Sequence, residues 1–391
     1  MQVSVPVSSE ILNWIISHVQ MDTLPQQIAK NLDLWYKGAK TPTFHQIEKA
    51  SQATGIPLGY FFLKTPPDED ISLAQYRTVD SIELNSPSRN LTDTMHHMEL
   101  VQDWAREHLI SEGATPVAVV GICEGRTAVS AVVNEMRTAL RFEPDWFRQS
   151  KSAEASFRTV RTAVSNAGVF VMMSGIVESN TRRTLDISEF RAFALTDAYA
   201  PLIFINANDS INGRLFSLLH EFAHICMGKN DLFNDRDSTG RAINPIETLC
   251  NAAAAEILVP QEFFTQAWEG LSSELDVDQK VYALTKIFKC GGTVIARKAL
   301  DNDLIERSQY QQIARLAVKR YQDSRKRKKE QGESGGNYYG TLASRIDRRF
   351  LGMLTGSVAE GKTLYSDAFR LTNTNRTTFK TLLEHIGGAE I

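Results

Sequence analysis

The pentapeptide His220-Glu221-Phe222-Ala223-His224 constrains the fold of this chain more than any other stretch. It lies in residues 215–226, a segment that is apolar on nearly every side and predicts a buried helix. Residues four apart on a helix lie one turn above each other, so the side chains of His220 and His224 point to the same side of the helix, and Glu221 faces the same cavity. Burying these polar groups without partners is costly. We therefore interpret the two histidines as ligands of one metal ion rather than as hydrogen-bonded histidines of an ordinary core.

A catalytic metal site of this kind needs a third protein ligand and one open position for water. The continuation with glycine three residues and histidine six residues after the second histidine is absent, because Met227 and Asn230 stand there. Residues 244–260 predict a second helix, which starts at Asn244-Pro245 and stops at Pro260. Its four consecutive alanines would let the metal-binding helix approach closely.

Glu247 and Asn251 share one face of this second helix, whereas Glu256 lies about a right angle or more away. We therefore predict Glu247 as the third ligand. An alternative stays open, because Glu247 would be the third helical residue after an N-cap at Asn244. A carboxylate at that position often reaches back to cap the helix.

At this point the residues resemble a known family. The predicted strand over residues 200–206, the pentapeptide, and the block from Glu247 through Asn251 to Leu258-Val259-Pro260 are similar to the ImmA/IrrE metallopeptidases over roughly residues 120–300. The resemblance implies a zincin-like core in which His220, His224 and Glu247 bind zinc. It also implies that Glu221 is the catalytic base and that Asn251 supports the ligands from outside.

The reaction implied by the resemblance is hydrolysis of a peptide bond. The substrate would be a helix-turn-helix repressor encoded nearby, and its cleavage would release genes of a mobile element or a stress response. A bound Zn²⁺ lowers the pKa of water and polarises the scissile carbonyl, while Glu221 takes and returns the proton. Two histidines and one glutamate favour zinc over manganese or iron.

Two parts of such a site stay open. Nothing in the sequence selects Tyr199 or Tyr282 over a backbone N–H as donor to the oxyanion. The strand over residues 201–206 either binds an extended substrate by edge pairing or is an ordinary core strand.

Length, composition and charge limit the fold and the class of protein that the whole chain can form. With 391 residues and 42% hydrophobic content, the chain is long enough for two or three domains with a sizeable core. A net charge of −3 argues against a strongly basic protein that wraps nucleic acid. The four cysteines lack paired metal spacing and fall in apolar segments, which predicts buried thiols and no disulfides. Because neither a signal-like start nor a membrane-length apolar run is seen, we expect a soluble cytoplasmic protein without a membrane partner.

We expect an α+β, mostly helical fold in five segments. Residues 1–66 form a helical module, 67–120 a linker with a connecting helix, 121–320 the metallopeptidase-like domain, 321–336 a basic and glycine-rich linker, and 337–391 a C-terminal helical module. The sequence does not predict an oligomeric state.

The N-terminal module resembles the Cro/repressor-type helix-turn-helix in residues 34–43, Ile47 and residues 56–62. Between Leu32 and Trp35 there is hardly room for a recognition helix. Charges nearly balance across residues 1–65, which predicts weak attraction to phosphates. A packing or partner-binding role is therefore favoured over DNA binding.

Two sets of basic residues are candidate nucleic-acid contacts. The first is the run at 325–329, for which a solvated helix end is the favoured interpretation and nucleic acid the alternative. The second set belongs to two short helices over residues 366–371 and 376–385, whose arrangement is typical of a helix-turn-helix. Binding to another protein is the favoured role of these two helices, and DNA binding is the alternative. These residues are Arg325, Lys326, Arg327, Lys328, Lys329, Arg376 and Lys380. They motivate a second hypothesis, a DNA-binding regulator or antitoxin-like partner with a latent or structural metal site.

Overall fold

The computed structural model describes residues 4–19, 21, 24–67, 87–228, 245–330 and 338–387. The chain divides into two compact units, one of Met1–Leu73 with Leu84–His96 and one of Ala74–Glu83 with His97–Ile391, and each is described by itself. Within the described ranges, no helix combines the length and apolar character needed to cross a bilayer.

The first unit is built on three short α-helices and one 3₁₀ turn. These are α1 (Ser9–His18), α2 (Gln26–Tyr36), α3 (Phe44–Thr54) and the 3₁₀ helix η2 (Leu58–Phe62). Their apolar faces close one core around Ile11, Leu32 and Phe61. The apolar periodicity of residues 9–18 and 44–54 predicts a helix in each segment, and both are confirmed. The pattern over residues 57–63 also predicts a short helix; the structure has a 3₁₀ turn there, which suits so short a segment.

The second unit contains the remaining helices and the sheet. Its helices are α4 (Arg89–Ser111, from His97 onward), α5 (Val129–Leu140), η3 (Trp146–Gln149), α6 (Ala153–Asn166), α7 (Ile211–Met227), α8 (Pro245–Leu258), α9 (Gln261–Glu269), α10 (Val277–Phe288), α11 (Gly292–Asp301), α12 (Arg307–Glu330), α13 (Tyr338–Arg345), α14 (Arg348–Ala359), α15 (Tyr365–Thr372) and α16 (Arg376–Gly387).

The sheet has the strand order β1-β3-β2, with β1 at Phe170–Ser174, β2 at Ala192–Leu195 and β3 at Leu202–Asn206. Strand β3 pairs with β1 in parallel and with β2 in antiparallel orientation. The edge-pairing interpretation of residues 201–206 is therefore wrong, because both sides of β3 are already paired. Every residue of β3 is buried, as expected of a central strand covered on both faces.

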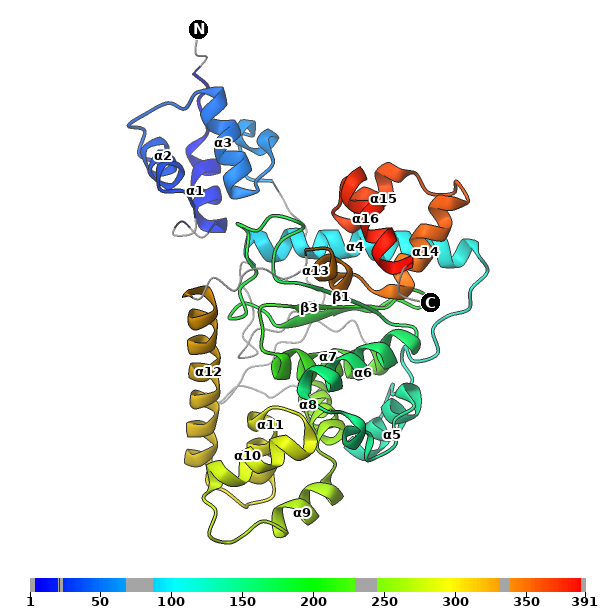
Figure 1. Cartoon of the computed structure of the whole chain (residues 1–391). Coiled ribbons are helices and arrows are strands. Elements are labelled where there is room, and N and C mark those ends of the chain that lie inside the picture. Colours follow the sequence, from blue (N-terminus) through cyan, green and yellow to red (C-terminus); the bar gives the residue numbers. More distant parts are fainter. Residues whose placement is uncertain are drawn as a thin grey trace. The chain divides into compact units, whose positions relative to one another are not determined.

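Helices cover both faces of the sheet (Figure 1). On one face α7 packs against β2 and β3, and α6 packs against β1 and α7. On the other face lies the second half of α4, where the amide of Gln102 donates to the carbonyls of Leu195 at 2.8 Å and Ala200 at 2.9 Å. Two helical layers around a small sheet confirm the predicted α+β, mostly helical class.

The C-terminal helices attach directly to the edge of β1. The carboxylate of Asp347 accepts the backbone N–H of Val171 at 3.1 Å, and Arg161 donates to the carbonyl of Ser344 at 2.7 Å. The rings of Phe350 and Phe170 meet edge to face with centroids 5.9 Å apart. These contacts cover the open edge of the sheet, where unpaired backbone groups would otherwise face solvent.

Several elements were not predicted from the sequence, namely β2, α9, α10, α11, α13 and α14. Strand β2 has only four residues, too few for an alternating pattern to be recognised. The long helix α12 continues to Glu330, so the basic run at 325–329 belongs to a helix. Residues 68–70, 244 and 331–336, which entered the predicted linkers and the predicted N-cap, lie outside the described residues.

Candidate metal centre

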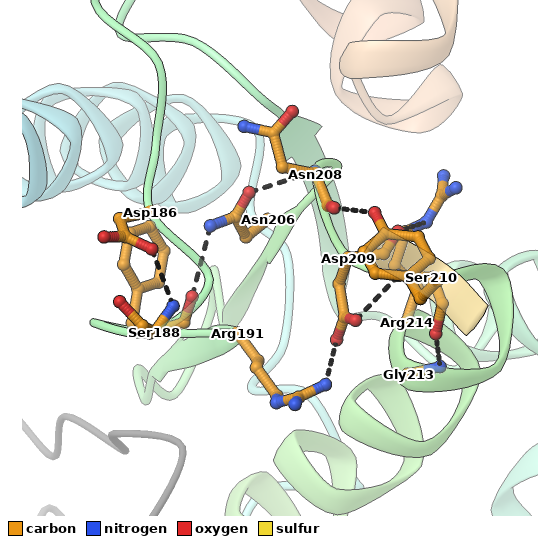
Figure 2. Close-up of polar contacts among 11 residues, drawn as sticks. Asp186, Ser188, Arg191, Asn206, Asn208, Asp209, Ser210, Gly213 and Arg214 are labelled. Carbon is orange, nitrogen blue, oxygen red and sulfur yellow. Dashed lines mark hydrogen bonds and ion pairs between the residues drawn. The ribbon is translucent and has the colours of Figure 1, made fainter. Parts of the chain in front are cut away.

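The loop before α7 is held by a network of polar contacts (Figure 2). Asp209 is buried; its carboxylate pairs with Arg191 at 2.7 Å and accepts the N–H of Ser210 at 2.7 Å. Ser210 caps α7 by accepting the N–H of Gly213 at 3.0 Å. A Cβ at position 213 would lie 2.2 Å from a carboxylate oxygen of Asp209, so a larger residue there would displace that side chain.

Further hydrogen bonds join this loop to the sheet and to α12. The amide nitrogen of Asn208 donates to the carbonyls of Gly175 at 2.6 Å and Leu185 at 2.8 Å. The hydroxyl of Tyr321, on α12, donates to the carbonyl of Asn208. Arg214 donates to the carbonyl of Asp209 at 3.1 Å (Figure 2). The start of α7 is thus fixed from several directions.

The other end of α7 is capped by backbone. Gly228 adopts a left-handed conformation with φ of 66°, and its N–H returns to the carbonyls of His224 and Ile225. A loop from earlier in the chain also donates there, from Gly121 N–H to Ile225 at 3.1 Å and from Cys123 N–H to Cys226 at 2.8 Å. These donors satisfy carbonyls that a helix end leaves unpaired.

His220, His224 and Glu247 converge between α7 and α8. One ligand atom from each lies within 4.8 Å of the other two, and all three residues are buried. The Nε2 atoms of His220 and His224 are 2.8 Å apart, and the Glu247 carboxylate oxygens lie 3.0 Å from His224 Nε2 and 3.5 Å from His220 Nε2. The structure therefore brings together the residues that the sequence predicts as ligands.

These separations fit a tetrahedral metal ion. Ligand atoms about 2.1 Å from a tetrahedral zinc lie about 3.4 Å from one another. The three observed separations bracket that distance. Two neutral imidazole nitrogens and one carboxylate oxygen are also a donor set that zinc accepts.

Helix α8 supplies Glu247 because it packs closely against α7. Ala253 and Ala254 are fully buried on α8, which also contacts α5. Glu256 points elsewhere: its carboxylate forms an ion pair with Lys298 and accepts a hydrogen bond from the backbone N–H of Gln261 at 2.9 Å. The carboxylate of Glu247 meets both imidazoles, while the proposed capping partner, Asn244, lies outside the described residues.

The pKa of His224 is raised well above that of an ordinary histidine. Burial lowers it, but the charge and hydrogen bond of Cys250 and the hydrogen bond and charge of Glu247 raise it more. The groups beside His224 therefore favour a positive charge there, and a bound metal ion would supply that charge in place of the proton.

Cys250 is a contact of the site that the sequence reasoning assigned only to the core. It lies on α8 three residues after Glu247 and is fully buried, and its interaction with His224 raises the pKa of that imidazole. The spacing of three residues from Glu247 was the signal available in the sequence. The prediction of buried thiols is confirmed for Cys123, Cys226, Cys250 and Cys290.

The other predicted site residues are placed as follows. Glu221 is buried on α7 beside His220, and Asn251 is partly buried one turn after Glu247 on α8. Of the basic run, Arg327 is exposed on α12, while the side chains of Arg325, Lys326, Lys328 and Lys329 lie outside the described part of the structure. Arg376 and Lys380 are exposed on α16. None of these described basic residues lies in the His-His-Glu cluster.

Comparison with known families adds two matches. Residues 166–299 match the family model Peptidase_M78, described as an IrrE N-terminal-like domain. This match contains the sheet, α7 and α8, and with the buried His-His-Glu cluster it supports a metallopeptidase of the ImmA/IrrE type. Residues 346–385 match DUF8813, a domain of unknown function. No protein with a curated description matches the chain.

Proposed function

We propose that this protein is a zinc-dependent, site-specific endopeptidase that cleaves a helix-turn-helix repressor. The observation that carries the proposal is the convergence of His220, His224 and Glu247 within 4.8 Å, with Glu221 buried on the same helix as the histidines. The match of residues 166–299 to a peptidase family supports the reaction class.

Within this proposal, the three residues hold the ion and Glu221 moves the proton. A zinc ion held there would act as a Lewis acid toward the scissile carbonyl and lower the pKa of water. Glu221 would accept a proton from the attacking water and return it to the leaving amine. Cys250 would orient the imidazole of His224, since the second ring nitrogen of a metal-binding histidine needs a partner that fixes its tautomer.

The repressor substrate is inferred from the family resemblance. A peptidase that acts on one partner needs a recognition surface beyond its catalytic groups, and this chain carries helical elements on both sides of residues 166–299. Such elements would bring the enzyme to its substrate and restrict cleavage to one bond.

Replacing Glu221 with glutamine tests the mechanism. The variant should retain one zinc per chain, measured by elemental analysis, and lose cleavage of the repressor encoded at the same locus, measured by mass spectrometry of fragments. Glu262→Gln, an exposed change on α9, is the matched control and should cleave normally. Proteolysis by Glu221→Gln at the normal rate would remove the mechanism. An active enzyme that spares every candidate repressor would remove only the substrate.

A DNA-binding regulator is the second candidate function, favoured by the shape of the C-terminal module. Helices α15 and α16 are joined by a short turn at residues 373–375, and Arg376 and Lys380 are exposed one turn apart on α16. The turn is attached to the rest of its unit, since Ser179 donates to the carbonyl of Asn373 at 2.6 Å. DNA binding by α16 would thus carry the metal centre to the operator, and the two functions can coexist.

Binding to the upstream DNA of the gene tests this candidate. Replacing both Arg376 and Lys380 with glutamine should weaken binding and reduce its dependence on salt, whereas Arg297→Gln, an exposed change on α11, should not. Chelation should leave the footprint unchanged. Absence of binding at moderate salt would count against this function.

A further inference from the structure

The loop between α4 and α5 is attached to the end of the metal-binding helix α7. Residues 112–128 contain no helix or strand, and the N–H of Gly121 donates to the carbonyl of Ile225 at 3.1 Å. The two backbones touch, since a Cβ on Gly228 would lie 2.5 Å from the Cα of Gly121. No side chain separates the loop from α7 at this point, so neighbouring residues of the two segments can come close enough for a covalent bond.

Cys123 of this loop and Cys226 of α7 lie side by side. The N–H of Cys123 donates to the carbonyl of Cys226 at 2.8 Å. Two residues joined in this way have Cα atoms about 5–6 Å apart, within the range of about 4.4–6.8 Å that a disulfide spans. Both side chains are fully buried in the same core cluster, and the two thiols interact, since Cys226 is the main influence on the pKa of Cys123.

Cys123 is the member of the pair that lies nearer to solvent. Residues 124–126 directly after it are exposed, whereas both neighbours of Cys226 in the chain are buried. Because the loop around Cys123 contains only turns, opening a few of its residues would bring this thiol to a small oxidant without unfolding the core.

The surroundings of Cys123 also favour its reactive form. The interaction with Cys226 lowers the pKa of Cys123 and Arg126 lowers it further, while burial and Glu135 raise it, and the net shift is downward. A thiolate, rather than a thiol, is the group that attacks a peroxide.

We propose that Cys123 and Cys226 form a peroxide-sensitive dithiol, whose oxidation joins the loop to the end of α7 by a disulfide. The sulfur of Cys123 attacks hydrogen peroxide: an S–O bond forms, the O–O bond breaks, and the departing hydroxide takes up the proton that the thiol lost. The thiol of Cys226 then attacks this sulfenic acid, so that the S–S bond forms and a second water leaves. One peroxide is reduced by two electrons, and the two thiols are oxidised.

The disulfide would change the stability of the helix that carries the metal ligands. It would close a loop of about 100 residues, a size at which a cross-link strongly restricts the unfolded chain. Cys226 follows His224 on the last turn of α7, so the bond would hold this end of the helix in place. The proposal is independent of peptide hydrolysis, because it requires neither Glu221 nor a bound metal.

Treating the reduced full chain with hydrogen peroxide, then alkylating it and mapping its peptides without reductant, tests the proposal. The parent should lose two of its four thiols, and mass spectrometry should find Cys123 linked to Cys226 within one chain. Cys290→Ser, a change at another fully buried cysteine, is the matched control and should form the same bond. Cys123→Ser should keep Cys226 as a free thiol.

Thermal unfolding gives a second readout. Peroxide should raise the melting temperature of the parent by about 5–10 °C, and it should not raise that of Cys123→Ser. Each protein is compared with its own reduced form, so a loss of stability caused by the substitution itself does not affect the result. The proposal would be overturned if all four thiols stayed free, if Cys226 paired with Cys250 or with another chain, or if the bond formed only in urea.

Discussion

Replacing Asp347 with alanine removes two kinds of contact at the junction of the C-terminal helices and the sheet. One carboxylate oxygen caps α14 by accepting the N–H groups of Arg349 at 2.9 Å and Phe350 at 3.3 Å. The other accepts the N–H of Val171 on β1 at 3.1 Å. Asp347 is only 2% exposed, so water cannot take over these contacts without opening the junction.

The expected loss of stability follows from these contacts. Removing a helix cap costs about 1 kcal/mol. Leaving the buried N–H of Val171 without an acceptor costs about 1–3 kcal/mol. The free energy of unfolding should therefore fall by about 2–4 kcal/mol. Burial already lowers the pKa of the nearby Arg161, which the charge of Asp347 opposes, so removing that charge adds to the loss.

Urea unfolding of the full chain measures this loss, and hydrogen exchange at the amide of Val171 locates it. Asp347→Asn, which keeps one acceptor oxygen, should lose less stability than Asp347→Ala. Glu384→Ala, an exposed change in the same module, is the control and should stay within about 0.5 kcal/mol of the parent. If Asp347→Ala is as stable as Glu384→Ala and Val171 exchanges no faster, the junction does not depend on this carboxylate.

Three further predictions concern acid stability, the loop before α7 and the metal. The pKa of His97 is lowered to about 4, mainly by burial and further by Arg370, against a hydrogen bond with the backbone of Leu371. Between pH 6.5 and 4 this histidine is protonated in the unfolded chain but not in the folded one, so the free energy of unfolding should fall by about 1.4 kcal/mol for each pH unit of acidification. His97→Gln should make the free energy of unfolding less dependent on pH in this range, and an unchanged slope would contradict the assignment. Gly213→Ala should lower the free energy of unfolding by about 1–3 kcal/mol, because its methyl group displaces the carboxylate of Asp209; a thermal melt equal to the parent's would show that the loop yields freely. Chelation should lower the melting temperature of the zinc-loaded parent but hardly change that of Glu247→Gln, and equal shifts would exclude Glu247 as a ligand.

The candidate site could be predicted wherever its geometry depends on one helix at a time. The spacing of His220 and His224 is enough to place both imidazoles on one side of α7, whatever packs around it. Glu247 was the harder case, since helical periodicity allows a carboxylate to cap as well as to bind. The approach of α8 to α7 brings that carboxylate within 3.5 Å of both imidazole nitrogens.

The pairing of segments that are distant in the chain could not be predicted from the sequence pattern. Residues 201–206 are apolar in either an edge strand or a central strand, and only the positions of β1 and β2 decide between them. The hydrogen bond between Val171 and Asp347 joins residues 176 positions apart, and the sequence around either residue does not predict it.

By itself, the sequence determined the periodic faces of the helices, their caps and the chemistry of the groups at residues 220, 221, 224 and 247. These depend on interactions within a few residues, which a helix of known pitch relates directly. Only the tertiary structure decided which strand is central, that Cys250 contacts His224, and that Cys123 lies beside Cys226. Such features arise where separate elements meet, because burial of apolar surface is non-directional and many arrangements satisfy the same pattern until the whole core is packed.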